Sequence, residues 1–441
     1  MTAKVTVVGA GLAGAECAFQ LAERGVGVAL IEQKPLARSA AHNSDGLAEL
    51  VCSNSFRAAA LTNAVGLLKE EMRRAGSLVM AAAERTSVPA GGALAVDRAA
   101  FSAEVTRRIR EHPLIELSSR VVGKIPPARP LVLATGPLTG GDLGEDLARV
   151  IGADHLAYYD AISPIVAGDS IDYSQVFFSS RYGKGEDDAY LNCPFNQEQY
   201  YCLIQAISKA EKAPPRDFEE PRYFEGCLPI EVMAERGPRT PAFGPMKPVG
   251  LIDPRTGKRP HAVVQLRRED REGTAFNLVG FQTRMPQSEQ KRVFALIPGL
   301  QNARYERFGS VHRNTFINAP QVLDSTLSLR ALAGVYLAGQ IAGVEGYVES
   351  AATGLCLGLM LAAELSGAKP EPPPPTTAFG ALLGHLQREQ KDFQPSNVTW
   401  SMFPSLSGIA IKNRGARREA LVQRALSDLA DWPLMGQIIR V

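Results

Sequence analysis

The chain has 441 residues, of which 45% are hydrophobic and 21% charged, and its formal net charge is +2. This length predicts two or three globular domains with a large core. No apolar run reaches the length needed to cross a bilayer, and the first strand begins almost at once, so we expect neither a membrane span nor a signal peptide.

Six cysteines, at positions 17, 52, 193, 202, 227 and 356, show neither CxxC nor zinc-ligand spacing. We therefore expect free thiols in a reducing cytoplasm and no metal site. The small net charge neither requires nor excludes nucleic acid, because a basic face can be offset by acidic surface elsewhere.

Residues 4–35 predict a strand, a glycine turn, a helix and a second strand that ends at Glu32. In this pattern the glycines form the turn, let the backbone approach a pyrophosphate and let the helix lie close to the strand. The carboxylate of Glu32 is placed to accept hydrogen bonds from ribose hydroxyls. We predict an adenine dinucleotide bound by Glu32 and by the turn residues Gly9, Ala10, Gly11, Leu12, Ala13 and Gly14.

A small, polar and irregular stretch follows at residues 38–63, and so long a loop is usually functional. In it, Cys52 precedes residues that predict the start of a helix continuing from Leu67 to Met80. A thiol at a helix N-terminus has a lowered pKa, and Arg57 is nearby in the sequence. These residues alone favour a reactive thiol and a buried, inert one equally.

Two further predicted elements belong to the first part of the nucleotide domain. Asp97 predicts the N-cap of a helix that runs to Arg110. Residues 131–137 predict a buried strand that enters a glycine turn at Gly136. In flavoproteins with two dinucleotide-binding motifs, a strand of this kind closes over the nucleotide, and Gly136 is therefore a candidate cofactor contact.

The middle of the chain, from about residue 154 to 304, mixes tyrosines, prolines and short apolar runs. This pattern predicts an inserted domain with more sheet than helix. Cys227 lies in it between an acidic and an apolar neighbour, which by composition favours a structural cysteine. Its arginine and lysine clusters are compatible with phosphate contacts and with an ordinary solvated surface.

A strand beginning at Val335 then leads into Gly339 and Gln340, and a helix of small residues runs from Glu349 to Leu365. A helix N-terminus at this point suits the pyrimidine edge of a flavin, where reduction places negative charge. An NAD enzyme needs no such returning segment, so we prefer FAD. The candidate contacts here are Gly339, Gln340, Gly346, Tyr347, Ala351 and Gly354.

Residues 368–377 predict a proline-rich linker, followed by a helix over Phe379–Glu389 and a basic helix from Lys412 to about Leu429. The basic helix is a candidate polyphosphate contact, and a solvated helix packed on the body is the alternative. The predicted fold is therefore α/β, a Rossmann-like FAD-binding domain of the two-dinucleotide type with an inserted mixed α+β domain. Its divisions are 1–155 and 306–368 for the FAD-binding domain, 156–305 for the insertion and 369–441 for the tail.

Sequence motifs along nearly the whole chain resemble those of the bacterial folate- and FAD-dependent tRNA (uracil-5-)-methyltransferases. They are VVGAGLAGAE (7–16), ELVCSNS (49–55), MRRAGSLVM (72–80), VPAGGALAVDR (88–98), ATGPLTG (134–140), YLNCP (190–194), GPMKPVGL (244–251), HRNT (312–315) and GVEGYVES (343–350). The chain departs from the family pattern near its end, where Ser396, Thr399 and Ser401 replace a methionine, an asparagine and a glycine.

The resemblance implies methylation of the T-loop uridine of tRNA, with methylenetetrahydrofolate as carbon donor, reduced FAD as reductant and NAD(P)H as the external electron source. It implies that Cys227 adds to uracil C6 and that Cys52 is the general base. The opposite assignment of the two roles stays open. It further suggests Tyr347 as a stacking partner of the pterin, assisted by His312 and Arg313. A related enzyme acting on ribosomal RNA, a small-molecule FAD oxidoreductase and a non-catalytic RNA-binding flavoprotein are the competing hypotheses.

Overall fold

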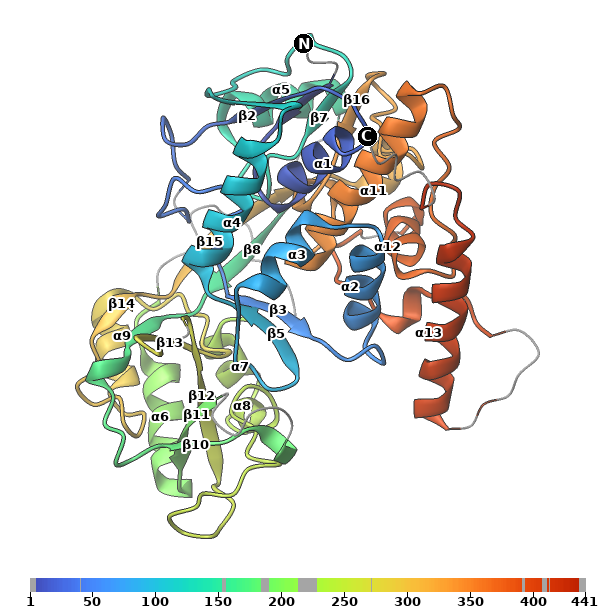
Figure 1. Cartoon of the computed structure of the whole chain (residues 1–441). Helices are drawn as coiled ribbons and strands as arrows, with labels where there is room; N and C mark the ends of the chain where they lie inside the picture. The colour runs from blue at the N-terminus through green and yellow to red at the C-terminus, as the bar shows by residue number, and fades with distance from the viewer. Residues whose placement is uncertain are drawn as a thin grey trace.

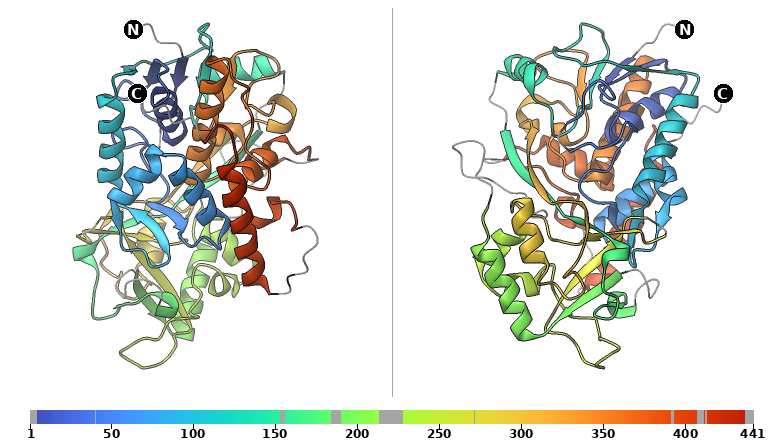
Figure 2. Two further views of the ribbon diagram at one scale, coloured as in Figure 1. Left: turned by 45° about the vertical axis from the view of Figure 1, so that its right-hand side comes forward. Right: turned by 90° about the vertical axis from the view of Figure 1, so that its left-hand side faces the viewer.

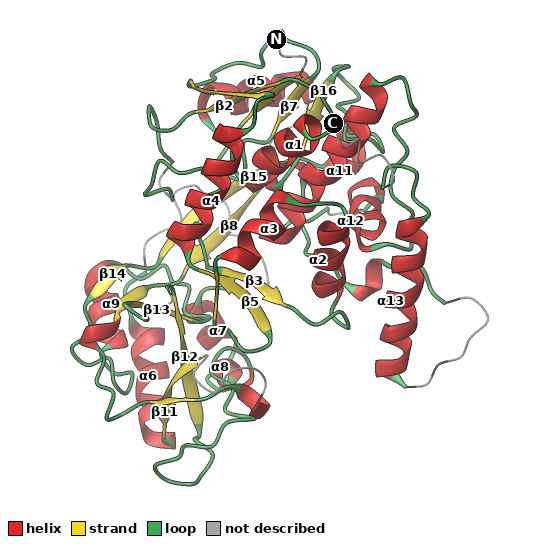
Figure 3. Cartoon of the chain, viewed as in Figure 1, coloured by secondary structure: helices red, strands yellow, loops and turns green. Residues whose placement is uncertain are grey.

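The computed structural model describes residues 5–39, 41–152, 156–183, 190–212, 228–270, 272–390, 393–406, 411 and 413–435, with the backbone alone for 156–162 and 311–314. Figure 1 shows an upper body formed by the two ends of the chain and a lower body formed by its middle. Both bodies combine strands with helices, as the colouring of Figure 3 makes plain.

The upper body is built on a five-stranded parallel sheet in the order β16-β7-β1-β2-β6. The strand before the glycine turn, β1, occupies the centre of this sheet, and its neighbours are short apolar runs, as in parallel sheets covered on both faces. The predicted α/β fold is thereby confirmed. The strands are β1 (Val5–Val8), β2 (Val28–Glu32), β6 (Ile115–Ser119), β7 (Leu131–Leu133) and β16 (Val335–Leu337).

Two helices from opposite ends of the chain cross closely above this sheet. They are α1 (Leu12–Ala22) and α11 (Tyr347–Leu365), and a Cβ atom on Gly354 would lie 2.1 Å from the carbonyl oxygen of Ala13. Gly354 therefore has a packing role that only the smallest residue can fill. The other helices of the nucleotide domain are α2 (Ala64–Arg74), α3 (Leu78–Arg85), α4 (Arg98–Glu111) and α5 (Gly141–Ile151).

Replacing Gly354 with alanine is expected to lower the free energy of unfolding by about 1–3 kcal/mol, because the new methyl group overpacks the α1–α11 crossing. Urea unfolding measures the change. Gly384 is the matched control, since it lies within a helix and an added Cβ would meet nothing within 4 Å. Gly384→Ala should instead stabilise the protein by about 0.5–1 kcal/mol, and equal losses in both variants would contradict the packing argument.

Within the described residues, α11 alone is long and apolar enough to be a candidate membrane span. Its most apolar window is, however, 89% buried inside the protein. Its contacts with α1 show why: the helix is apolar because protein surrounds it. The expectation from sequence, that no apolar run reaches the length needed to cross a bilayer, is therefore wrong for this helix by length and composition.

Two antiparallel elements join the upper body to the lower one. A three-stranded sheet has the order β3-β5-β4, and a two-stranded pair, β8 with β15, runs between the bodies (Figure 1). Because β8 leaves the nucleotide domain and β15 returns to it, the lower body is an insertion between them. The strands are β3 (Ser55–Ala58), β4 (Ser87–Val88), β5 (Ala93–Val96), β8 (Leu156–Ile162) and β15 (Ser310–Phe316).

The lower body has a six-stranded antiparallel sheet in the order β10-β11-β12-β13-β9-β14 and a hydrophobic core of its own. Its strands are β9 (Ile165–Ala167), β10 (Phe177–Phe178), β11 (Tyr190–Phe195), β12 (Ala262–Arg268), β13 (Ala275–Leu278) and β14 (Tyr305–Arg307). Its helices are α6 (Gln197–Lys209), α7 (Ile230–Arg236), α8 (Thr240–Phe243) and α9 (Gln287–Phe294), with short 3-10 turns η1 (Gly168–Ser170) and η2 (Arg181–Gly183).

The C-terminal part of the chain packs on the upper body, and Figure 2 shows it alongside α2 and α11. Phe379, Phe393 and Trp432 belong to the main hydrophobic core, and the Trp432 indole donates to the carbonyl of Glu371 in the proline-rich segment (2.9 Å). The predicted linker is therefore a packed segment. The elements of this part are α12 (Ala378–Gln387), η5 (Trp400–Met402) and α13 (Arg414–Ala430), and the returning segment before α11 adds α10 (Ala319–Val322) and η4 (Gln340–Ala342).

A buried carboxyl group holds the start of α12. Glu71 accepts hydrogen bonds from the backbone N–H groups of Ala378 (2.7 Å) and Phe379 (2.8 Å). Burial raises the pKa of Glu71 to about 8, against these two bonds, which lower it. The folded chain therefore binds a proton here that the unfolded chain releases above pH 4.5.

This shift predicts that stability falls as pH rises from about 4.5 to 8, with a slope of at most about 1.4 kcal/mol per pH unit from this group. Replacing Glu71 with glutamine should flatten that part of the stability profile, measured by urea unfolding at each pH. Glu419→Gln, on the exposed face of α13, serves as the control and should leave the profile unchanged. An identical slope in wild type and Glu71→Gln would sink the prediction.

Candidate functional site

The glycine turn after β1 forms an open cradle at the carboxyl ends of the central strands. Gly9 has a positive φ of 95°, and a Cβ on Gly14 would lie 1.8 Å from its carbonyl oxygen, so the turn and α1 are pressed together. Over Gly11 and Gly136, by contrast, an added Cβ would meet nothing within 4 Å. This open space above exposed backbone at a helix N-terminus fits the pyrophosphate of a dinucleotide.

Glu32 lies beside this cradle at the end of β2, as predicted. One carboxylate oxygen accepts from the N–H of Ala10 (2.8 Å) and the other from the N–H of Lys34 (3.1 Å). The side chain therefore fixes the turn as well as presenting a carboxylate next to it. Its predicted contact with a ribose stays a prediction.

The returning segment completes the cradle from the other side. Gly339 has a φ of 82°, and a Cβ there would lie 2.8 Å from the Cβ of Ala13. Gln340 donates to Glu345 (2.7 Å), and Gly346, with a φ of 101°, is the N-cap of α11. The candidate cofactor residues from both ends of the chain thus converge, with Tyr347, Ala351 and Gly354 following on α11.

The loop that carries Cys52 contradicts one prediction. Cys52 precedes the strand β3, and the next helices along the chain begin only at Ala64 and Leu78, so Cys52 does not stand at the start of the helix that follows it in sequence. The helix signals were misread because Ser53, Asn54 and Ser55 serve another purpose, namely to tie the loop to distant segments. Arg57 was expected to assist the thiol, but its guanidinium is paired with Glu349.

Tyr347 holds this loop from the side of α11. Its hydroxyl oxygen accepts hydrogen bonds from the backbone N–H groups of Cys52 (2.7 Å) and Ser53 (3.0 Å). Burial raises the pKa of Tyr347, so the phenol stays neutral and keeps its own proton to donate. The predicted stacking partner is thus also a fixed point for the half-buried Cys52.

The inserted sheet holds the same loop from below through Arg267 on β12. The guanidinium of Arg267, 6% exposed, donates to Asn54 (2.7 Å) and to Ser53 (2.9 Å). The Asn54 amide donates in turn to the carbonyls of Val96 (3.0 Å) and Arg268 (2.8 Å). Residues from α11, β5 and β12 therefore fix the loop that presents Cys52, and we name Ser53, Asn54, Arg267 and Tyr347 the loop clamp.

A third tie connects the start of α11 with the C-terminal segment. Glu349, fully buried, accepts from Arg57 and from the N–H of Val398 (2.9 Å). The carbonyl of Ser396 accepts from the N–H of Glu345 (3.0 Å). Since Ser396 makes this contact through its backbone, its departure from the family pattern leaves the contact intact.

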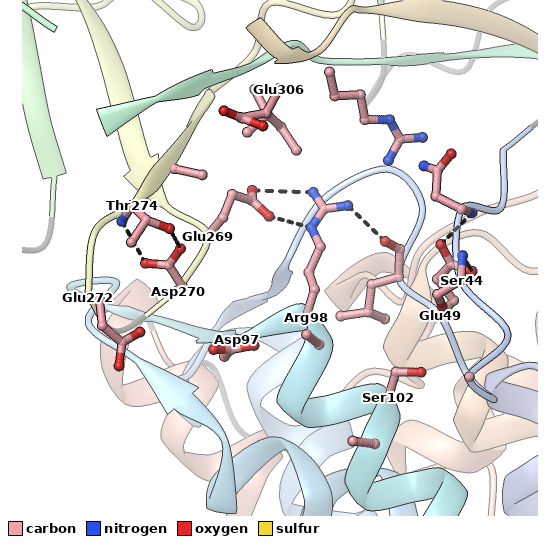
Figure 4. A pocket seen from close by; sticks show the side chains of 18 of the residues that line it. Ser44, Glu49, Asp97, Arg98, Ser102, Glu269, Asp270, Glu272, Thr274 and Glu306 are labelled. Atoms are coloured by element: carbon pink, nitrogen blue, oxygen red, sulfur yellow. Dashed lines mark hydrogen bonds and ion pairs between the residues drawn. The ribbon is translucent and has the colours of Figure 1, made fainter. Parts of the chain in front are cut away.

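A cleft of about 1690 Å³ opens between α4 and the turn after β12 (Figure 4). Arg98 lies in the lining of this cleft. Its guanidinium donates from Nη2 to the Glu269 carboxylate (3.3 Å) and from Nη1 to the carbonyl of Leu50 (2.8 Å), two residues before Cys52. The Glu269 carboxylate raises the pKa of Arg98 although burial alone would lower it. The cleft therefore adjoins the Cys52 loop, and among the residues that the structure describes, no predicted site residue lines it.

Removing the Tyr347 hydroxyl tests the loop clamp. Tyr347→Phe leaves two backbone N–H groups without their acceptor, so we expect the free energy of unfolding to fall by about 1–3 kcal/mol and Cys52 to be alkylated faster. Denaturant unfolding and iodoacetamide kinetics measure the two effects. Tyr201→Phe, at an exposed tyrosine of α6, is the control, and an unchanged alkylation rate in Tyr347→Phe would count against the clamp.

Several sequence predictions fall outside what the structure describes. Cys227 lies outside the described residues, as does Lys412. The backbone of His312 and Arg313 lies in β15, and their side chains are outside the described part. The joint placement of Cys52 and Cys227 stays a prediction.

Comparison with known proteins places the chain among relatives. The family model for glucose inhibited division protein A, GIDA, matches residues 4–369. The methylenetetrahydrofolate–tRNA-(uracil-5-)-methyltransferase TrmFO of Geobacter sulfurreducens is 57% identical over 433 residues, which cover 98% of this chain and 99% of that protein. The chain belongs to the TrmFO family. The TrmFO of Anaeromyxobacter dehalogenans is 56% identical over 435 residues, or 97% of this chain and 96% of that protein.

A solved structure of Aquifex aeolicus GidA has the same fold as this TrmFO family member. It superposes with a TM-score of 0.70 at 16% identity, covering 99% of this chain and 75% of that one. At this identity the likeness supports the fold alone. It agrees with the parallel sheet and the antiparallel insertion described above.

The sequence predicted the residues of the glycine cradle but not those that hold the Cys52 loop in position. Arg267 is separated from Asn54 by 213 residues, and in the sequence it reads as one more surface arginine. The available signal was Asn54 itself, a polar residue in an irregular loop, whose burial gives it four hydrogen bonds to satisfy. No local pattern could name its partners.

Proposed function

We propose that this chain methylates C5 of a uracil in tRNA, with methylenetetrahydrofolate as the one-carbon donor. The observation that carries the proposal is the 57% identity to a TrmFO protein over nearly the full length of both chains, supported by the glycine cradle and by the half-buried Cys52, whose N–H is bonded to Tyr347 at the start of α11. The cradle residues would hold FAD, which supplies the electrons that convert a methylene to a methyl group. NAD(P)H as external reductant and the T-loop uridine as target belong to the same proposal.

The chemistry explains why thiols are needed. Uracil C5 is a poor nucleophile until a thiolate adds at C6, after which the ring enolate attacks the one-carbon donor. A base must then remove the C5 proton so that the thiolate can leave. We assign the addition to Cys227 and the proton removal to Cys52.

The loop clamp supports the role of Cys52 as a fixed base. A general base must lie within hydrogen-bond reach of the proton that it removes. Because Tyr347 binds the backbone at Cys52 itself, the position of the thiol is tied to the N-terminus of α11. The target base must leave its stack to reach this point, as in other enzymes that modify a nucleobase.

Covalent trapping tests the proposal. A T-arm stem-loop containing 5-fluorouridine cannot lose a C5 proton, so FAD-loaded protein with methylenetetrahydrofolate should form an adduct that survives a denaturing gel. Cys227→Ala should form none, whereas Cys202→Ala, at an exposed thiol of α6, should react normally. An adduct in Cys227→Ala would overturn the assignment, and an adduct with a ribosomal RNA hairpin alone would overturn the choice of tRNA.

A further inference from the structure

The inserted domain exposes large apolar side chains next to basic ones around α8. Phe243 is 72% exposed, Tyr182 is 62% exposed and Ile252 is 57% exposed. The guanidinium of Arg239 lies over the Phe243 ring, 5.6 Å from its centroid, and Lys247 is exposed on the following loop. We call Tyr182, Arg239, Phe243, Lys247 and Ile252 the α8 patch.

This surface is held in place rather than loosely attached. Arg181 donates to the carbonyl of Val249 (3.0 Å), and the N–H of Tyr182 donates to the carbonyl of Gly250 (2.9 Å). The same arginine also donates to Gln265 on β12 (2.9 Å). An exposed aromatic ring on a fixed loop costs little ordering entropy when it binds a partner.

One strand, β12, carries a contact of the segment beside Tyr182 and a member of the loop clamp. Gln265 accepts a hydrogen bond from Arg181, and Arg267 donates hydrogen bonds to Ser53 and Asn54. These two residues are two positions apart on β12. Side chains two apart on a strand share a face and are separated by about 7 Å. The anchors of the α8 patch and of the Cys52 loop are therefore neighbours on the same strand.

Charge distinguishes this surface from the large cleft. Residues 236–259 contain six arginines and lysines and one carboxylate, Asp253, which is bonded to Arg255. The cleft is lined by nine carboxylates and five arginines, so it repels a polyanion. In Figure 1, α8 lies on the right of the lower body, whereas β14, which contributes Glu306 and Arg307 to the cleft, lies on its left.

We propose that the α8 patch binds an unpaired base of the RNA loop next to the target uridine. The Phe243 ring stacks on the base, and Arg239 and Lys247 contact the adjoining phosphates, an arrangement that aromatic and basic side chains provide for single-stranded RNA. This inference rests on the proposed function. It goes beyond that function by assigning the α8 patch as the surface that binds the nucleotide next to the target uridine.

Binding of a fluorescein-labelled T-arm stem-loop transcript, followed by anisotropy, tests the inference. Phe243→Ala should weaken binding about 10- to 100-fold. Phe243→Trp should bind as wild type does, since any aromatic ring at this position can stack on a base. Lys247→Ala should reduce the slope of log affinity against log salt by about one.

Leu36→Ala is the matched control, because Leu36 is 66% exposed and lies outside the patch. Unchanged RNA affinity in Phe243→Ala, with active wild-type enzyme, would overturn the inference, as would an equal loss in Leu36→Ala. Wild-type protein that loads FAD but methylates no RNA would instead refute the proposed function. The two failures are thus distinguishable.

Discussion

Replacing Cys52 with alanine is expected to lower the rate of tRNA methylation by about 10²- to 10⁴-fold, the usual contribution of a general base. The variant should still fold and bind FAD, because Tyr347 and Arg267 hold the loop through the backbone at Cys52 and through the side chains of Ser53 and Asn54. Methylation is measured with radiolabelled methylenetetrahydrofolate, and FAD content by absorbance.

Cys202→Ala provides the matched comparison, as Cys202 is an exposed free thiol on the inserted domain. It should keep wild-type activity. If Cys52→Ala retained more than a tenth of the wild-type rate with full FAD content, Cys52 would not be the base. A loss of FAD in Cys52→Ala would show that the thiol instead supports the cofactor site.

Replacing Arg267 with methionine is expected to reduce the maximal rate about 100-fold, since a small displacement of a catalytic group is costly. The substitution keeps an unbranched stem but removes the guanidinium and its donors to Asn54 and Ser53 in the Cys52 loop. Because those donors are charged, the loss is larger than for a neutral hydrogen bond. The rate at saturating RNA and the pH dependence of Cys52 alkylation are the measurements.

A merely structural role of Arg267 would lower stability without changing the alkylation profile of Cys52. Arg267→Lys should recover part of the rate, because it restores one charged donor but not the two-pronged geometry. Arg292→Met, at an exposed arginine of α9 paired with Glu289, is the control within the same domain. An alkylation profile identical to that of wild type in Arg267→Met would contradict the positioning role.

The glycine cradle could be predicted from sequence because its signals are local. Gly9, Gly14 and Glu32 fall within one strand–turn–helix–strand unit, where spacing fixes geometry. The returning strand and α11 were also predictable, since β16 enters a glycine turn and α11 consists of small residues. Gly354 shows the limit, because the structure gives it a packing role against Ala13 that sequence spacing does not reveal.

The Cys52 loop could not be predicted because its partners are far away in the chain. Ser53 and Asn54 are residue types that begin helices, and this local preference was outweighed by the pairing of β3 with β5 and by bonds to Arg267. The predicted linker does join α11 to α12 without helix or strand, but its packing could not be predicted for a similar reason. Its prolines indicate stiffness, but only tertiary packing places Glu371 against Trp432.

A single-turnover experiment tests the central claim most directly. Protein with chemically reduced FAD is mixed with unmodified tRNA and methylenetetrahydrofolate in the absence of NAD(P)H, and the RNA, flavin and folate products are quantified together. We predict one 5-methyluridine formed for each flavin oxidised, with tetrahydrofolate as the released folate. Methylation that leaves the flavin reduced and yields dihydrofolate would contradict the account, as would flavin oxidation without any methylated uridine.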